Sequence, residues 1–289
     1  MPNSIPASSD VRLFADDTSI IIHNQDIYTL MQDASSDLAL IQDWFNLNKL
    51  CLSLNKSCFL IFRGVKKPNL SQIKTISVGE ESISRAATAK YVGLTLDETL
   101  NWEAHIAELC NSLVKYFSVF YNIRHLINKK LARTIYFAGI YCRIKYGIEI
   151  YGAASACKMN RLQTLQNRLL KTLLCKQPLY GTDQLHSELN ILKVCDIHNC
   201  SVLQFVYNCI NEPIPALQTY YTRQNEMHNH DTRFRESISI NRYRTELGRS
   251  TTHNRGAKLW NDLDSSITNA KTQKEFKNLI ERWYKSSYS

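Results

Sequence analysis

The chain has 289 residues, of which 44% are hydrophobic and 21% are charged, a composition typical of a folded globular protein with room for one or two buried domains. No apolar run approaches the ~20 residues that span a membrane, and the N-terminus lacks the basic-then-apolar pattern of a secretion signal. These features exclude a membrane protein and favour an intracellular location, cytoplasmic or nuclear. The formal net charge of +9 points to an acidic partner.

The first predicted element is a short acidic hairpin. Residues 11–14 and 18–22 have the pattern of two strands, with Asp16 and Asp17 at the bend between them. Adjacent carboxylates suit Mg²⁺, which prefers oxygen ligands, and a pair of such ions clamps the attacking and leaving oxygens of a phosphoryl displacement. Because side chains alternate along a strand, Asp16 is expected to be the principal ligand. The alternative is a solvated turn, in which Asp is common.

Three further elements follow the hairpin in the first third of the chain. Apolar residues recur at helical spacing over 27–45. The segment 50–57, which contains Lys56, leads into a strand at 59–62. A strand bend is expected at Gly93. Trp102 follows and is expected to anchor the core.

The middle of the chain is predicted to be helical and strongly basic. Helices are expected over 103–126, 129–146 and 158–174, and in the second of them Leu131, Ile135 and Ile140 are expected on the apolar face. Residues 111–180 contain twelve Lys/Arg and a single acid, Glu149. In the third helix, leucines form a core stripe, and four basic residues are expected on the opposite side as a nucleic-acid-binding surface: Lys158, Arg161, Arg168 and Lys171. The alternative is an ordinary solvated helix face.

The last part of the chain is less regular. Residues 222–253 are interpreted as a loop-rich connector containing arginine and tyrosine, which can stack bases. Helices are expected around 254–263 and 272–285. The segment 195–200 carries two cysteines and a histidine without zinc-finger spacing, so no zinc is expected and buried thiols on a helix are favoured.

Several short motifs, taken in order, resemble the reverse transcriptases of non-LTR (LINE-type, jockey-like) retrotransposons. Phe14-Ala15-Asp16-Asp17 is similar to the family's active-site turn, and Lys90-Tyr91-Val92-Gly93 is similar to its primer grip. The segment 52–57 is similar to the family's Leu-x-Leu-Asn-x-x-Lys-Thr element, although Ser53 and Ser57 replace the usual Asn and Thr. Weaker matches continue at Tyr151-Gly152, Leu165-Gln166-Asn167-Arg168, Thr232-Arg233, Gly256 and Leu259-Trp260-Asn261.

The resemblance implies an α+β fold: a truncated antiparallel polymerase palm (1–102), a helical, thumb-like basic region (103–219) and a C-terminal tail of loops and helices (220–289). It implies that Asp16 and Asp17 bind Mg²⁺ or Mn²⁺, and that Lys56 lies near the nucleotide triphosphate. The implied partners are an RNA template and a DNA primer, with the primer contacted by Tyr91, Val92 and Gly93. Without the resemblance, Lys56 reads equally well as a surface lysine and Gly93 as a strand bend.

In the resembled family a first catalytic aspartate lies upstream, on a neighbouring strand. Here the hairpin is preceded by Asn3-Ser4-Ile5-Pro6, which is similar to the family's connector, and by one acid, Asp10, expected on the incoming strand itself. The chain is therefore expected to be a fragment of an RNA-directed DNA polymerase that is inactive alone. The alternative is a non-catalytic RNA- or DNA-binding module derived from a retroelement.

Overall fold

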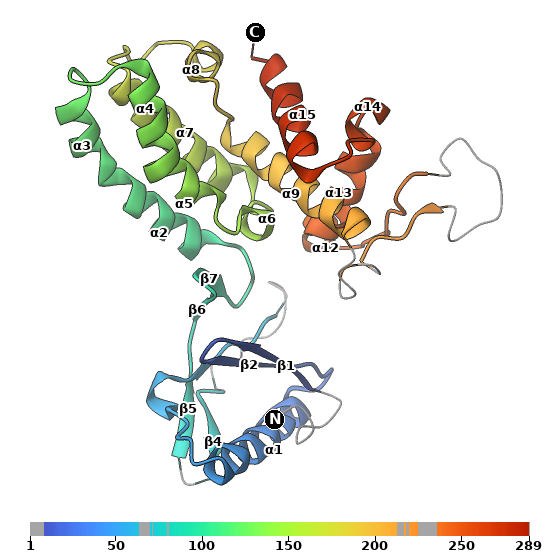
Figure 1. Cartoon of the computed structure of the whole chain (residues 1–289). Helices are drawn as coiled ribbons and strands as arrows, with labels where there is room; N and C mark the ends of the chain where they lie inside the picture. The colour runs from blue at the N-terminus through green and yellow to red at the C-terminus, as the bar shows by residue number, and fades with distance from the viewer. Residues whose placement is uncertain are drawn as a thin grey trace. The chain divides into compact units, whose positions relative to one another are not determined.

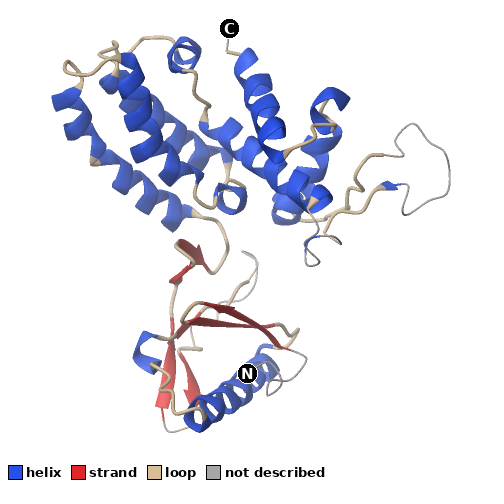
Figure 2. Cartoon of the chain, viewed as in Figure 1, coloured by secondary structure: helices blue, strands red, loops and turns tan. Residues whose placement is uncertain are grey.

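The computed structural model describes residues 9–63, 70, 72–79, 81–212, 217, 220–224 and 236–288. It divides into two compact units, Met1–Ala104 and His105–Ser289 (Figures 1 and 2). The first is a mixed α/β unit with small sheets, and the second is mostly helical. No helix in the described part of the chain is both long and apolar enough to cross a membrane.

The described strands of the first unit form three small sheets. Strands β1 and β2 pair as an antiparallel hairpin, β3 lies parallel to β5 with β4 antiparallel on its other side, and β6 and β7 form a second hairpin. The elements are β1 (Ser9–Phe14), β2 (Asp17–Ile22), α1 (Ile27–Leu47), the 3₁₀ turn η2 (Leu54–Lys56), β3 (Cys58–Phe59), β4 (Thr75–Val78), β5 (Glu81–Arg85), β6 (Thr88–Tyr91) and β7 (Leu94–Asp97).

Helix α1 organises the core of this unit. Asp26 caps its N-terminus by accepting a hydrogen bond from the Thr29 N–H at 2.8 Å, which satisfies one of the free donors of the first turn. Its buried face includes Ala34 and Ile41. A separate small cluster of Leu54, Val78 and Ile83 is covered by side chains that include Leu38 from α1 and Phe59 from β3. The helix predicted over 27–45 is confirmed.

The second unit is built from helices that begin at the boundary between the units. They are α2 (Glu103–Val114), α3 (Tyr116–Ile123), α4 (Lys129–Tyr136), the π-helical turn η3 (Phe137–Tyr141), α5 (Cys142–Lys145), α6 (Ile148–Tyr151), α7 (Ala156–Leu173), α8 (Thr182–Leu189), α9 (Val194–Asn211), α12 (Glu246–Ser250), α13 (Thr252–Asn261), α14 (Ser265–Thr268) and α15 (Gln273–Ser286). The helices predicted over 158–174, 254–263 and 272–285 are confirmed. The helices predicted over 103–126 and 129–146 are also present. The first is broken at Lys115, and the second contains the π-helical turn η3 in its middle.

Helix α9 is the centre of this unit. It packs against α6, α7, α13 and α15 (Figure 1) and has buried residues around most of its circumference, as a helix enclosed by neighbours must. Cys200 is buried on α9, as predicted, and Cys209 is buried there too. Cys195 is exposed, so the prediction of a buried thiol was wrong at that position. Trp260 of α13 is buried, and so is Trp102 of the first unit. No group of three described His, Cys, Asp or Glu side chains is arranged to hold a metal ion.

One core prediction was wrong. Leu131 was placed on the apolar face of its helix, but it is 46% exposed, whereas Ala132 and Tyr136 are buried. The buried face of α4 is therefore rotated by about one residue, or ~100°, from the predicted one. Arg133 lies beside this face and donates from Nε to the Leu189 carbonyl at 3.1 Å.

Buried histidines make the second unit sensitive to acid. Burial, with a smaller contribution from Lys193, lowers the pKa of His186 to about 4, and burial, helped by Arg255, lowers the pKa of His198 to about 3. In the unfolded chain both histidines take up a proton near pH 6.5. Between this pH and the lower pKa values of the folded state, the unfolded state binds more protons than the folded state does, so the free energy of unfolding falls as the pH falls. Burial raises the pKa of Asp196, which acts in the opposite direction.

We therefore expect the free energy of unfolding, measured by urea denaturation, to drop by about 1–2 kcal/mol for each of these two histidines between pH 7 and pH 5. Equal stability of the wild type at the two pH values would contradict the prediction.

Candidate functional site

The acidic hairpin has the predicted form. Phe14 pairs with Asp17 across the two strands, so Ala15 and Asp16 make a two-residue turn. Ala15 has φ +52°, a left-handed conformation that costs a residue with a Cβ about 1 kcal/mol. Asp16 lies in the turn, Asp17 is the first residue of β2, and both side chains are exposed. The hairpin therefore presents two adjacent carboxylates to solvent.

The third acid within the hairpin, Asp10, is already engaged. Asp10 lies on β1 opposite Ile21, as expected for a residue on the incoming strand, and forms an ion pair with Arg12 at 2.8 Å. Asp16 and Asp17 thus remain as the oxygen donors at the turn. Two adjacent carboxylates fit Mg²⁺ or Mn²⁺, because Mg²⁺ is usually held by one or two protein carboxylates, and waters and phosphate oxygens complete its coordination.

Lys56 and the second hairpin are also at the surface of the first unit. Lys56 ends the turn η2, and its side chain is exposed. Tyr91 pairs with Leu94, so Val92 and Gly93 form a two-residue turn with φ +45° and +76°. Two successive positive φ values define a type I′ hairpin turn, and this conformation alone accounts for a glycine at position 93.

The four basic residues predicted on α7 do not share one surface. Arg168 and Lys171 line a groove against α3, whereas Arg161 is exposed outside it. Lys158 is half-buried and lies four residues before Leu162, which places it on the leucine side of the helix at 3.6 residues per turn. Its predicted position on the opposite face was therefore wrong. The leucine stripe itself is confirmed, with Leu162, Leu165, Leu169 and Leu173 buried.

We refer to this feature as the α3–α7 groove, a surface hollow of about 900 Å³. It is lined by Phe117, Tyr121, Arg124, His125, Thr164, Asn167, Arg168, Lys171, Thr172, Cys175, Lys176 and Pro178. None of these residues is acidic, and five of them are arginine, lysine or histidine. A hollow with this lining attracts anions.

Two of the lining cations are held by other groups. Lys171 donates from Nζ to the Pro178 carbonyl at 2.5 Å, and Lys176 forms an ion pair with Glu188 at 3.0 Å. The hydrogen bond to Glu188 raises the pKa of Lys176, which keeps that ammonium charged. Both lysines are therefore held in fixed positions in the lining of the groove, and Glu188 offsets the charge of Lys176.

The two arginines of the groove lie against aromatic rings. The Arg124 guanidinium carbon is 3.5 Å from the centre of the Tyr121 ring, and that of Arg168 is 5.4 Å from the centre of the Phe117 ring. Within the described residues neither arginine forms an ion pair. Their guanidinium groups are therefore available to an anionic ligand.

The sequence pattern missed Tyr121, Arg124 and Lys176 as members of this site. The available signal was the excess of basic residues over 111–180, which contains all three. Helical periodicity within α7 does not reveal that α3 supplies the other wall.

The arginine-rich segment 222–253 falls partly outside the described residues, including Thr232-Arg233. Within the described part of this segment, α12 is helical and Arg223 pairs with Glu236 at 2.8 Å.

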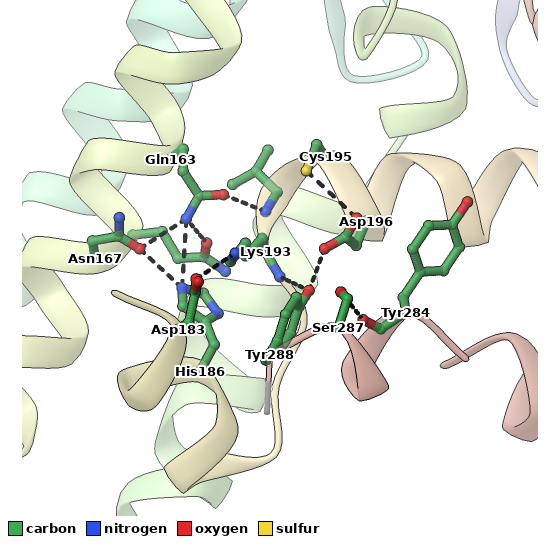
Figure 3. Close-up of polar contacts among 12 residues, drawn as sticks. Gln163, Asn167, Asp183, His186, Lys193, Cys195, Asp196, Tyr284, Ser287 and Tyr288 are labelled. Atoms are coloured by element: carbon green, nitrogen blue, oxygen red, sulfur yellow. Dashed lines mark hydrogen bonds and ion pairs between the residues drawn. The ribbon is translucent and has the colours of Figure 1, made fainter. Parts of the chain in front are cut away.

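A second polar cluster lies where α7, α8, the start of α9 and the C-terminal residues meet (Figure 3). Gln163 accepts from the Val194 N–H at 2.6 Å, and His186 Nε2 bonds Asn167 Oδ1 at 2.9 Å. The Tyr288 hydroxyl donates to Asp196 and accepts from the Lys193 N–H at 3.1 Å. These groups are paired mainly with one another, and the cluster ties the C-terminus to α9 as a structural contact.

Comparisons with known proteins relate the chain to mobile elements. It is 29% identical over 113 residues to a probable RNA-directed DNA polymerase from transposon BS of Drosophila melanogaster, covering 38% of this chain and 12% of that protein. It is 22% identical over 199 residues to a probable RNA-directed DNA polymerase from transposon X-element of the same species, covering 67% and 21%.

A third relative is the RNA-directed DNA polymerase from mobile element jockey of Drosophila melanogaster, 21% identical over 189 residues, covering 64% of this chain and 20% of the relative. The matched part of the chain thus spans between 12% and 21% of the length of these curated relatives. No family model matches, and no solved structure matches. The chain is similar, at low identity, to part of the RNA-directed DNA polymerases of Drosophila non-LTR retrotransposons, which supports a relation to reverse transcriptases.

Proposed function

We propose that this chain carries the metal-binding hairpin and a nucleic-acid-binding helical region of a non-LTR retrotransposon RNA-directed DNA polymerase. The observation that carries the proposal is the hairpin turn, which presents Asp16 and Asp17 side by side to solvent. Its support is the similarity to three such polymerases. On this proposal the first unit corresponds to part of a polymerase palm, and the basic helices of the second unit correspond to a thumb.

Each residue then has a defined role. Asp16 and Asp17 hold Mg²⁺ or Mn²⁺, which when bound stabilises the attacking and leaving oxygens of nucleotidyl transfer. Lys56 offsets negative charge on the triphosphate. The turn at 91–93 contacts the DNA primer, and Arg161, Arg168 and Lys171 contact the backbones of template and primer.

Two exposed carboxylates are a small share of the ligands that a pair of divalent ions needs, so we expect the chain alone to bind primed RNA without extending it. Incubating the chain with primed RNA, nucleotides and Mg²⁺ should give no extended primer. If the wild type extended the primer and Asp16→Asn did not, the hairpin would suffice for catalysis. That result would overturn the expectation of inactivity. Because Asp16 is exposed, this variant should fold normally.

Binding should depend strongly on salt. If the basic residues of the helical unit neutralise about four phosphates, the logarithm of the association constant should fall with the logarithm of salt concentration at a slope between about −3 and −4. Fluorescence anisotropy with a labelled primer–template at several salt concentrations measures this slope. Arg168→Gln should make it shallower by about one, whereas Arg223→Gln, which alters an arginine already paired with Glu236, should leave it unchanged. A flat salt dependence would contradict the proposal.

The second candidate function is a non-catalytic module that binds RNA or DNA. It is favoured by the α3–α7 groove, all of whose lining residues belong to the second unit. The two functions differ in the hairpin. If the hairpin binds metal, Mn²⁺ should broaden the NMR signals of residues around Asp16 at submillimolar concentration, and Asp16→Asn should abolish the broadening. Unchanged spectra together with salt-dependent nucleic-acid binding would favour the second function.

A further inference from the structure

The α3–α7 groove combines charge with flat side chains. The lining cations come from the residues that follow α3, from α7 and from the residues after α7, while Phe117 and Tyr121 supply two aromatic rings from one face of α3. A site for inorganic phosphate needs the charge alone. The rings add a surface on which a planar group can lie, and nucleic acids carry a planar base beside every phosphate.

Arg124 and Tyr121 together form a stacking platform. The Tyr121 side chain is 59% exposed, and its ring lies under the Arg124 guanidinium at 3.5 Å. Arg124 also donates from Nε to His125 Nε2 at 2.9 Å, which fixes the plane of the guanidinium. A guanidinium plane backed by a tyrosine ring can stack an unpaired base on its outer side.

His125 links this platform to the other wall of the groove. Its Nδ1 lies 3.7 Å from Sγ of Cys175, and its Nε2 accepts from Arg124 Nε at 2.9 Å. Cys175 follows α7 and has φ +53°, where the Lys176 N–H returns to the Lys171 carbonyl at 2.9 Å in a Schellman turn. The walls are thus connected through the ends of their helices.

We infer that the α3–α7 groove is a binding site for a single-stranded stretch of RNA or DNA, in which a base stacks on Arg124 and Tyr121 while Arg168 pairs with a neighbouring phosphate. The inference rests on the proposed nucleic-acid binding and specifies what occupies the groove. A duplex offers its phosphates, but its bases are stacked inside, so it gains nothing from the platform. A volume of about 900 Å³ lies within the range of small-molecule sites and accommodates one or two nucleotides.

The test compares single-stranded and duplex oligonucleotides of the same length, with the full chain and its variants in fluorescence anisotropy. Tyr121→Ala should weaken single-strand binding about fivefold or more and leave duplex binding within about twofold. Tyr121→Phe, which keeps the ring, should retain single-strand binding. Arg223→Gln is the control for Arg168→Gln, because Arg223 is already paired with Glu236 and lies outside the groove. Arg168→Gln should reduce single-strand binding several-fold, whereas Arg223→Gln should leave it unchanged.

A second measurement locates the ligand without a substitution. Cys175 lines the groove, and Cys157 is exposed near the start of α7 outside it. A saturating single-stranded oligonucleotide should slow alkylation of Cys175, followed by peptide mass spectrometry, at least fivefold and leave Cys157 unchanged. Equal alkylation of Cys175 with and without the oligonucleotide, or equal effects of Tyr121→Ala on both nucleic acids, would overturn the inference while nucleic-acid binding as such remained. Absence of any binding at low salt would instead overturn the proposed function.

Discussion

Replacing Gly152 with alanine is expected to lower the free energy of unfolding of the helical unit by about 2–3 kcal/mol. Gly152 directly follows α6 and is buried. A Cβ on it would lie 2.5 Å from the ring carbon Cδ2 of His198 and 2.5 Å from the Ile148 carbonyl oxygen. Neither neighbour yields easily, because one belongs to a buried ring on α9 and the other to the backbone.

Urea denaturation followed by circular dichroism measures the effect. The matched control is Gly181→Ala, where the nearest atom to the new Cβ is Oε1 of the flexible Gln184 side chain at 3.1 Å. The control should change stability by less than about 0.5 kcal/mol. If the two alanine variants were equally stable, α6 and α9 would not be packed as closely as described.

The second large effect is expected at Gln166, a fully buried side chain of α7. It donates from Nε2 to the Tyr136 hydroxyl at 2.7 Å and to the Leu192 carbonyl at 3.0 Å. Gln166→Leu leaves both buried partners without this hydrogen bond, and each loss costs about 1–3 kcal/mol. We expect a total loss of about 2–4 kcal/mol in the free energy of unfolding.

A double-mutant cycle tests the physical reason. Tyr136→Phe removes the stranded hydroxyl, so in the Gln166→Leu background it should cost at least about 1 kcal/mol less than in the wild type. Burial raises the pKa of Tyr136 far above its usual value, so the tyrosine is uncharged and its ionisation does not complicate the cycle. Strictly additive effects of the two substitutions would show that the hydrogen bond contributes nothing.

The local sequence was sufficient to predict elements in which apolar residues recur at a regular spacing or in which a turn is flanked by strand-like runs. The leucines of α7 recur every three or four residues, and the bend at Asp16 follows from strand-like runs on both sides. Short helices carry too few turns for a period to show. Helix α8, of 8 residues, was not predicted; it is followed by Asn190 in the left-handed conformation.

The site was predictable only in part. The number of basic residues can be read from the sequence, but the sequence does not show which of them lie close together in the fold. The excess of basic residues over 111–180 is visible in the sequence. The failure at Leu131 arose because the spacing of a helix shows its faces, while the neighbouring helices decide which face is buried. The failure at Lys158 was avoidable, because its spacing from Leu162 already places it on the leucine side. Packing of α7 on α3 selects Arg168 and Lys171 for the groove and leaves Arg161 outside.

The sequence by itself determined the paired carboxylates of the first hairpin, the glycine-containing turn of the second, the basic middle region and the similarity to retrotransposon polymerases. These features depend on neighbouring residues or on counts along the chain. The tertiary structure alone decided that Arg124 and Arg168, 44 positions apart, line one groove beside aromatic rings. It also decided that Gly152 has no room for a Cβ and that Gln166 forms hydrogen bonds to Tyr136 and Leu192 inside the core. Contacts between distant segments arise only when burial of apolar surface brings helices together, and no local pattern records them.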